Sequence, residues 1–433
     1  MMSKKVAFHT LGCKVNYFES EGVWEKFSQA GYERANFTDF ADVYVINTCS
    51  VTNGGDKKSR QFIRRAVRQN PDAVVCVMGC FSQTQPSVVV EIEGVDIVIG
   101  TSGRNQLVVL VEKFLESRKP INIVGDIAKE QTFESLTVAK FDNRKRGILK
   151  IQDGCNNFCT FCIIPWARGR VRSEKPKTVI AQAQELVANG HVEIVLTGIH
   201  TGAYGEDLKD YTFANLLAQL VKIDGLKRLR ISSIEATELT EEVLAVLASS
   251  NEIAKHLHIP IQSGSDTILK AMNRKYNLNE FEANIKRIRE SLPDVSITTD
   301  IIVGFPGETA QMFTESIETV KRIGFSDIHV FPYSPRNGTK AAKMSNQVPE
   351  IMKTMRVSEM IATGERLAGV YASIFNQRTL DVIVERTKDG YATGRASNYL
   401  NIKFPIEEHF NEHVVKVKIT KPGYPMCEGV LLN

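Results

Sequence analysis

Short β-branched segments alternate with amphipathic helical segments along most of this 433-residue chain. In the first part, strands are predicted at 5–11, 42–48, 73–79 and 96–100, and helical segments at about 17–31, 54–69, 83–93 and 103–118. Alternation at this spacing favours a parallel sheet with helices on its faces. We therefore predict an α/β fold class that begins with a parallel sheet domain over residues 1–118.

The alternation returns after residues 119–146, whose weak periodicity indicates a linker or an interdomain crossing. Between 147 and 370 the strand–helix unit repeats about six times. Strands are predicted at 147–152, 192–197, 228–232, 256–260, 295–303 and 327–333, with helical segments between them. Six such units with polar residues at the strand ends predict a full or partial (βα)6 barrel whose chemistry lies at the carboxyl ends of the strands.

The rhythm changes again over residues 371–433. Strand-like segments at 379–385, 391–395, 400–405 and 414–419 are separated by glycine and proline, without a convincing helical pattern. Short strands of this kind predict a small all-β barrel or sandwich. The chain is therefore expected to contain three domains and one linker.

Composition excludes several classes of protein. Hydrophobic residues make up 43% of the chain and charged residues 24%, which excludes a disordered or collagen-like chain. No apolar run reaches the ~20 residues of a membrane span, and the start of the chain lacks the features of a signal peptide. We expect a cytoplasmic protein without membrane contact. Its net charge of +4 leaves room for a local basic patch.

Three of the eight cysteines lie in a single loop. Cys155, Cys159 and Cys162 follow the strand predicted at 147–152 with the spacing C-x3-C-x2-C. Three thiolates this close share one centre, but they are one ligand short of a closed structural zinc site. Thiolate is the usual ligand of iron–sulfur clusters. We predict a [4Fe–4S] cluster with one iron free to bind a small molecule.

Three further cysteines, Cys13, Cys49 and Cys80, each follow a predicted strand of the first domain. Loops at the carboxyl ends of neighbouring parallel strands converge, so these thiols are predicted to hold a second cluster. The glycine before Cys13 and before Cys80 lets the backbone approach a bulky ligand closely. The alternative for each is a small buried hydrophobic side chain, which is our prediction for Cys76 and Cys427.

Longer motifs resemble the radical S-adenosylmethionine (SAM) methylthiotransferases, and the resemblance covers nearly the whole chain. The motifs are GCNNFCTFCIIPWARG at 154–169, LTG at 196–198, HIPIQSGS at 258–265, TDIIVGFPGE at 299–308 and FPYS at 331–334. Trp166 stands where many family members carry Tyr. The resemblance implies an N-terminal methylthiotransferase domain, a radical SAM partial barrel and a C-terminal TRAM domain, in that order.

The segment around the first cysteine, TLGCKVN at 10–16, is similar to the subgroup that acts on threonylcarbamoyladenosine. It implies methylthiolation at carbon 2 of that base, at position 37 beside the anticodon of tRNA. Members acting on isopentenyladenosine tend to have Gly-Cys-Gln-Met-Asn here, and those acting on a ribosomal-protein aspartate Gly-Cys-Pro-Lys-Asn. These two substrates remain alternatives, as does a non-catalytic iron–sulfur protein that binds RNA.

The resemblance implies two [4Fe–4S] clusters and two roles for SAM, with the hard chemistry carried by the cofactors. One SAM binds the open iron at the Cys155, Cys159 and Cys162 cluster and yields a radical, and another methylates a sulfur at the second cluster. An electron donor such as flavodoxin or ferredoxin and a sulfur source are implied partners. The implied SAM contacts are Phe161, Thr197, Gly198, Ser232, Ser233, Glu235, Gln262, Arg274 and Gly304.

Local positive charge indicates where tRNA binds. Basic residues flank the cysteine loop on both sides, and phosphate contacts of this kind dominate affinity for nucleic acid. For the basic helix face over 57–68, simple solvation is a rival explanation. In the C-terminal domain the RNA-binding role comes only from the resemblance to TRAM domains. The predicted RNA contacts are Arg144, Lys145, Arg146, Arg168, Arg170, Arg172, Arg395, Lys416 and Lys418.

Overall fold

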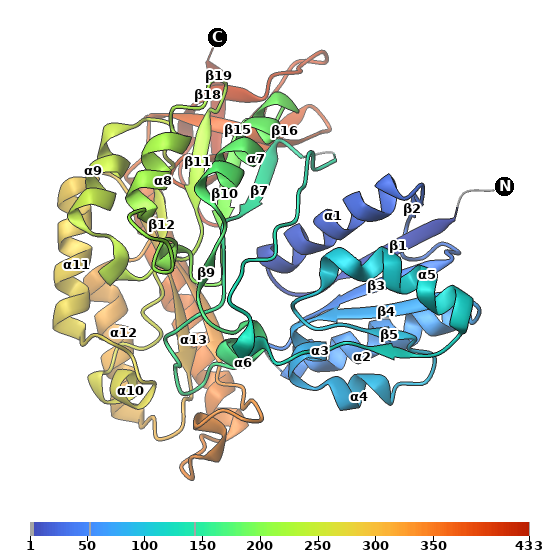
Figure 1. Cartoon of the computed structure of the whole chain (residues 1–433). Coiled ribbons are helices and arrows are strands. Elements are labelled where there is room, and N and C mark those ends of the chain that lie inside the picture. Colours follow the sequence, from blue (N-terminus) through green and yellow to red (C-terminus); the bar gives the residue numbers. More distant parts are fainter. Residues whose placement is uncertain (1–3, 52, 143, 433) are drawn as a thin grey trace.

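The computed structural model describes residues 4–51, 53–142 and 144–432. Residues 1–3, where no signal peptide is predicted, and Asn143 of the predicted linker lie outside these ranges. Figure 1 shows the N-terminal sheet domain in blue and cyan beside a larger body of strands and helices, with the C-terminal β-domain packed on one end of that body. The predicted α/β fold class is confirmed.

The N-terminal domain is a parallel sheet covered by helices. Its strands are β1 (Lys5–Thr10), β2 (Glu33–Ala35), β3 (Val43–Thr48), β4 (Val74–Gly79), β5 (Ile97–Val98) and β6 (Ile121–Asn122), in the order β2-β1-β3-β4-β5-β6. Its helices are α1 (Lys14–Gln29), α2 (Asn53–Gln69), α3 (Cys80–Thr84), α4 (Pro86–Val90) and α5 (Leu107–Ser117). Every residue of β3 and β4 is buried, because apolar clusters cover both faces of the sheet.

Two details of this domain differ from the sequence-based expectation. The single helix predicted at 83–93 is instead two short helices, because Pro86 cannot continue α3 and begins α4. Strands β2 and β6 were not predicted, since segments of three and two residues are too short to show a period.

The central body is a partial barrel of six parallel strands. They are β7 (Arg146–Lys150), β10 (Glu193–Thr197), β11 (Arg228–Ile231), β12 (His256–His258), β13 (Ser296–Val303) and β14 (Asp327–Pro332). They form two three-stranded sheets, β11-β10-β7 and β12-β13-β14, and single bridges from Leu229 to Ile253 and from Ser233 to His258 join the two. The predicted (βα)6 partial barrel is therefore present.

Helices cover the outside of this barrel. The longer ones are α7 (Pro176–Ala188), α8 (Phe213–Leu220), α9 (Glu241–Ser249), α11 (Leu278–Ser291), α12 (Ala310–Ile323) and α13 (Glu350–Ser373). Shorter elements lie in the loops: β8 (Gln152–Asp153), α6 (Ile164–Arg168), β9 (Arg172–Ser173) and α10 (Asp266–Ala271). The antiparallel pair β8 and β9 brackets the cysteine loop.

The C-terminal domain is a closed five-stranded barrel. Of the two predicted architectures, the barrel is therefore confirmed and the sandwich is not. Its strands are β15 (Thr379–Lys388), β16 (Tyr391–Ala396), β17 (Asn401–Pro405), β18 (Val414–Lys421) and β19 (Cys427–Leu432), in the closed order β15-β16-β17-β19-β18. Burial alternates along β16 and β18, as expected for strands with one face inside a barrel. Cys427 is buried in this core, as predicted.

The C-terminal barrel covers the amino ends of the partial-barrel strands. Arg228, the first residue of β11, donates hydrogen bonds to the carbonyl oxygens of Arg395 and Asp381 at 3.0 and 2.9 Å. Arg146, the first residue of β7, pairs with Glu385 at 2.7 Å. The cysteine loop lies at the opposite end, after β8. Within the described ranges, no helix is both long and apolar enough to cross a membrane.

Candidate functional site between two domains

The loop after β8 gathers Cys155, Cys159 and Cys162. The backbone N–H of Cys155 donates to the carbonyl of Gly169 at 3.0 Å, and the N–H of Cys162 donates to that of Cys159 at 3.0 Å. Gly154 has a φ of +76°, and a side chain there would place its Cβ 1.8 Å from the carbonyl oxygen of Arg170. Glycine is thus required for the loop to close.

The chemistry of these three thiols fits a cluster. All three are free thiols. Burial, together with a smaller effect from the neighbouring Cys159 and Cys155, raises the pKa of Cys162 to about 12. Burial also raises the pKa of Cys159, opposed by Arg274. Metal coordination stabilises buried thiols such as Cys159 and Cys162 as thiolates, which agrees with an iron–sulfur site.

Two polar pairs border this cysteine loop. Arg274 forms an ion pair with Glu235 and donates from Nη1 to the Sγ of Cys159 at 3.5 Å. His200 lies 3.8 Å from the Sγ of Cys155 through Nδ1, while its Nε2 pairs with Glu238. Glu235 and Arg274 are among the residues predicted from the sequence, whereas His200 and Glu238 are not. Their position in the loops that follow strands β10 and β11 was the available signal.

The structure brings most of the predicted SAM contacts to this end of the barrel. Phe161 and Gln262 line a cavity of about 210 Å³ together with Cys162. Gly198 lies against Gln152, whose Nε2 donates to the carbonyl of Gly154 at 2.7 Å in the cysteine loop.

Among the other predicted SAM contacts, Thr197 is the buried last residue of β10, next to Gly198. Ser232 and Ser233 follow β11, and the Oγ of Ser232 is buried without a hydrogen-bond partner. Gly304 differs. A Cβ at this position would lie 2.4 Å from Lys353 Cγ, so the close approach that this glycine permits is to helix α13.

The second set, Cys13, Cys49 and Cys80, sits at the carboxyl ends of β1, β3 and β4, which are neighbours in the sheet. A Cβ on Gly12, whose φ is +101°, would lie 3.0 Å from the Cβ and 3.1 Å from the Sγ of Cys49. Gly79, at φ +104°, would meet the carbonyl oxygen of Thr48 at 2.5 Å. Because Gly12 and Gly79 have no side chains, the loops that carry Cys13, Cys49 and Cys80 can approach one another.

The thiols of this second set are close enough to influence one another electrostatically. All three are free. Burial raises the pKa of Cys80 to about 12; Arg168 opposes the rise, whereas Cys13 and Cys49 add to it. Val51, two residues after Cys49, lines the same cavity as Cys162 of the first set. The segment that follows Cys49 therefore reaches the cavity beside the first cysteine set. Cys76, by contrast, is fully buried in the apolar core, as predicted.

A buried charged network joins the two sets. Arg168, in α6 just after the cysteine loop, has an exposed fraction of 0%. It donates from Nε to the Sγ of Cys80 at 3.3 Å and from Nη2 to Asn16 at 2.6 Å. It also pairs with Glu19 of α1 and, at 3.3 Å, with Asp153. Buried charges persist only when paired in this way.

Two other cations complete this network. Lys150 lies 2.8 Å from Glu19 and 2.6 Å from Asp153, and Arg104 lies 2.5 Å from Glu19. Burial alone would raise the pKa of Glu19, but Arg104 and Arg168 beside it hold that pKa well below its usual range. The network thus keeps Glu19 ionised and fixes the N-terminal domain against the barrel.

The predicted RNA contacts divide into sequestered and accessible residues. Arg168 is fully buried, and Arg172 is 4% exposed, with Nη2 donating to the carbonyl of Arg168 at 2.9 Å. Arg146 pairs with Glu193 and Glu385, and Lys145 lies 2.8 Å from His413. Burial leaves no face of Arg168 or Arg172 for a phosphate, so we leave both out of any RNA surface.

The other predicted RNA contacts lie nearer the surface. Arg144 is exposed above the ring of Tyr17, 4.3 Å from its centroid, and Arg170 is exposed above Phe158 at 4.9 Å. Lys416 is exposed and Lys418 half-buried on β18. Arg395 is half-buried over Tyr399, at 4.0 Å.

Comparison with known proteins places these observations in context. The Radical SAM superfamily matches residues 149–320, and the Uncharacterized protein family UPF0004 matches residues 5–100. Threonylcarbamoyladenosine tRNA methylthiotransferase MtaB of Bacillus subtilis (strain 168) is 53% identical over 430 residues, which cover 98% of this chain and 95% of that protein. The tRNA-2-methylthio-N(6)-dimethylallyladenosine synthase of Carboxydothermus hydrogenoformans is 35% identical over 442 residues, with 100% of both chains covered.

Among solved structures, the radical SAM methyltransferase TsrM from Kitasatospora setae is similar to this chain. The TM-score is 0.58 at 16% sequence identity, over 79% of this chain and 77% of that chain. At this identity the likeness concerns the fold alone.

Proposed function

The chain belongs to the radical SAM tRNA methylthiotransferases, and we propose that it adds a methylthio group to carbon 2 of threonylcarbamoyladenosine at position 37 of tRNA. The observation that carries the proposal is a direct link between the two three-cysteine sets: Arg168, which follows the loop of one set, donates a hydrogen bond to the sulfur of Cys80 in the other at 3.3 Å. A single cluster would suffice for radical formation, whereas sulfur insertion needs a second sulfur-bearing centre. The name of the B. subtilis relative supports the base substrate.

Membership in the radical SAM superfamily implies one [4Fe–4S] cluster and SAM. We assign this cluster to Cys155, Cys159 and Cys162, and a second [4Fe–4S] cluster to Cys13, Cys49 and Cys80. When bound, these groups supply the radical and the sulfur, and the methyl group comes from SAM. The chain's own residues position and shield them. Arg274 directs an N–H at Cys159, and Arg168 directs one at Cys80.

The apolar lining of the cavity beside Cys162 suits radical chemistry. Phe161, Ile163 and Ile302 contribute side chains there, beside the polar Gln262 and Asp300. Such a lining excludes water, which protects a reactive intermediate and strengthens polar contacts inside the cavity. Gln262 is available to orient SAM or the adenine.

Mass spectrometry of tRNA nucleosides tests the base substrate. A deletion strain should lose methylthio-threonylcarbamoyladenosine and accumulate threonylcarbamoyladenosine, and a plasmid carrying the wild-type chain should restore the methylthio product. A plasmid carrying Cys49→Ala is the matched control and should not restore it. Loss of the methylthio form of isopentenyladenosine instead would move the proposal to that base. Unchanged nucleosides would support action on a ribosomal-protein aspartate or a non-catalytic RNA-binding role.

The proposal also includes partners. An electron donor such as flavodoxin or ferredoxin would reduce the radical SAM cluster, and a sulfur source would replenish the second one. The tRNA would contact the accessible basic residues Arg144, Arg170, Lys416 and Lys418, with phosphates as the main ligands. Action on tRNA supports a cytoplasmic location. Replacing Arg170 with Gln should weaken tRNA binding and reduce its dependence on salt concentration, while leaving SAM cleavage without tRNA unchanged.

A further inference from the structure

A third group of metal-ligating side chains lies inside the partial barrel, apart from both cysteine sets. It consists of His258 of β12, Asp300 of β13 and His329 of β14, and one ligand atom from each lies within 4.8 Å of the others. The register of the sheet places Asp300 directly opposite His329, and His258 opposite Thr298. Three adjacent strands therefore each contribute one donor to the same point.

The spacing of these donors fits coordination of one ion. Asp300 Oδ1 lies 3.2 Å from His258 Nε2 and 3.3 Å from His329 Nδ1. Both distances exceed the ~2.7–2.9 Å of a charge-assisted N–H···O hydrogen bond. Atoms that share a metal at bonds of ~2.0–2.2 Å lie roughly 3.0–3.4 Å from one another, which matches both separations.

A neighbouring side chain orients the first histidine. The Nδ1 of His258 lies 2.8 Å from the Oγ1 of Thr298, which leaves Nε2 as the nitrogen that faces Asp300. Metal-binding histidines usually have their second nitrogen held in this way. The rings of His258 and His329 are stacked, with centroids 5.3 Å apart and an angle of 27° between the planes. The donor set is thus held by the sheet and by a polar contact.

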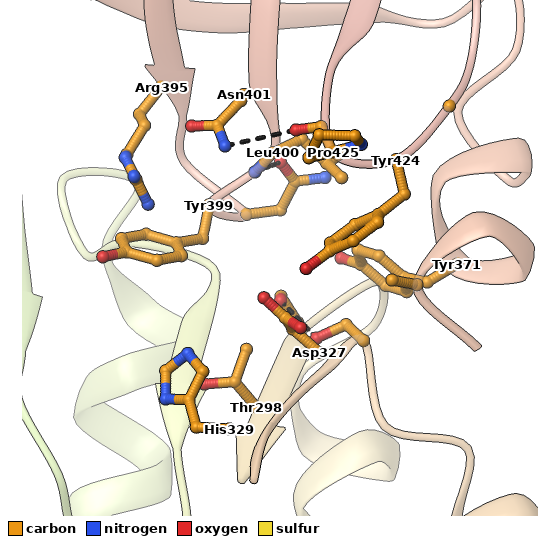
Figure 2. A pocket seen from close by; sticks show the side chains of 15 residues that line it. Thr298, Asp327, His329, Tyr371, Arg395, Tyr399, Leu400, Asn401, Tyr424 and Pro425 are labelled. Carbon is orange, nitrogen blue, oxygen red and sulfur yellow. Dashed lines mark hydrogen bonds between the residues drawn. The ribbon is translucent and has the colours of Figure 1, made fainter. Parts of the chain in front are cut away.

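Open space lies on both sides of this group. Asp300 lines the cavity of about 210 Å³ that also contains Phe161 and Gln262. His329 lines another cavity, of about 220 Å³, between the partial barrel and the C-terminal barrel. Figure 2 shows this second cavity, with Thr298 beside His329 below and side chains of the C-terminal barrel above. Three protein ligands with room for further ones are the arrangement of a 2-His-1-carboxylate site.

We propose that His258, Asp300 and His329 bind one divalent transition-metal ion of the class that includes Fe²⁺, Zn²⁺ and Mn²⁺. Imidazole and carboxylate donors suit these ions, whereas the cysteine sets suit iron–sulfur clusters. The ion would present its open positions to oxygen-bearing groups in the cavity beside Gln262. The site is separate from the proposed clusters, because none of its ligands is a cysteine.

Manganese binding to the full-length, cluster-loaded protein tests this site. Mn²⁺ is the probe because thiolate sites bind it poorly, and loss of the free-ion signal in electron paramagnetic resonance (EPR) reports binding. The oxidised protein, dialysed against a chelator, should bind about one Mn²⁺ per chain, and Zn²⁺ should displace it. Asp300→Asn and His329→Gln should each weaken binding at least tenfold. The His329 side chain is 49% exposed, so its replacement leaves the fold intact.

Asp327→Asn is the matched control. Asp327 lies in the same strand as His329 and lines the same cavity, but it does not belong to the three-residue group. This variant should bind Mn²⁺ like the wild type, and all variants should contain the same cluster iron. The proposal is overturned if the wild-type protein binds no Mn²⁺ at millimolar concentration, or if Asp300→Asn and His329→Gln bind it as the wild type does.

Discussion

Arg168 donates a hydrogen bond from Nε to the sulfur of Cys80 at 3.3 Å. The two residues belong to different domains, since Arg168 ends the helix that follows the radical SAM cysteine loop and Cys80 begins helix α3, directly after strand β4 of the N-terminal sheet. The segment that carries one cysteine set therefore contacts a member of the other set directly. This contact holds Cys80 of the second set at a fixed position relative to the loop that carries the first set.

Replacing Arg168 with Gln should lower both stability and the reduction potential of the second cluster. Glu19 and Asp153 would remain buried without one cation, and breaking a buried ion pair costs about 3–5 kcal/mol. The loss of a positive charge and an N–H donor beside a ligating sulfur lowers a cluster's potential. Urea unfolding and an EPR-monitored redox titration measure the two effects.

Arg170→Gln is the control for this prediction, because Arg170 is two residues away and exposed. It should keep wild-type stability and potential. Arg168→Lys keeps the charge and should recover part of the potential. A folded Arg168→Gln protein whose second cluster retains the wild-type potential would show that the contact with Cys80 has no influence on the cluster.

The two cysteine sets should fail in different ways. Alanine at Cys155, Cys159 and Cys162 should abolish formation of 5′-deoxyadenosine, whereas alanine at Cys13, Cys49 and Cys80 should spare it and stop methylthio transfer. Each triple variant should retain about four irons per chain, against about eight in the reconstituted wild type. Iron analysis and chromatography of the products check this.

A cysteine outside both sets provides the control. Cys76 is fully buried in the apolar core of the N-terminal sheet, so Cys76→Ala should keep the full iron content and both activities. If the variant lacking Cys13, Cys49 and Cys80 transferred methylthio groups normally, the assignment of a second cluster would be wrong.

The sequence predicts the strands well, because strands depend on local pattern. Strand β4 is a continuous apolar run with a glycine and a cysteine at its end, and the structure places it beside β3 as expected. Arg168 shows what the sequence alone could not predict. Its charge beside the cysteine loop predicted an RNA contact, but its partner Glu19 is distant in sequence, and only the folded domains reveal that the two meet.

Two glycines with similar backbone conformations should respond differently to substitution. Gly154→Ala would place a Cβ 1.8 Å from the carbonyl oxygen of Arg170, at a φ of +76°. The backbone at Arg170 cannot move away from this Cβ without opening the cysteine loop. The Gly154→Ala variant should therefore lose the radical SAM cluster. Gly190 has a φ of +89° but no atom within 4 Å of an added Cβ.

Gly190→Ala is therefore the matched control for Gly154→Ala. It should cost only the strain of a left-handed alanine, about 1–2 kcal/mol, and should bind the same amount of iron as the wild type. Iron content per chain separates the two variants. Equal iron in both would mean that the loop can form the cluster without the tight contact at Gly154.

His191 should make the stability of the protein fall in mild acid. The backbone N–H of Phe141, in the predicted linker, donates to His191 Nε2 at 3.0 Å, so this ring must be neutral to accept. Burial, with a smaller effect from Lys140, holds the pKa of His191 below its ordinary value of 6.5. The unfolded chain therefore binds this proton more readily than the folded protein. Stability from the neutral ring is fully present above about pH 6.5 and is lost as the pH falls below that value.

Urea unfolding at a series of pH values from about 7.5 to 5.5 measures this dependence. His191→Gln offers an uncharged acceptor to Phe141, so its unfolding free energy should fall less over this range than that of the wild type. His409 is exposed in the C-terminal domain, and His409→Gln should follow the wild-type curve. If His191→Gln loses as much stability as the wild type on acidification, groups other than His191 control the pH dependence of stability.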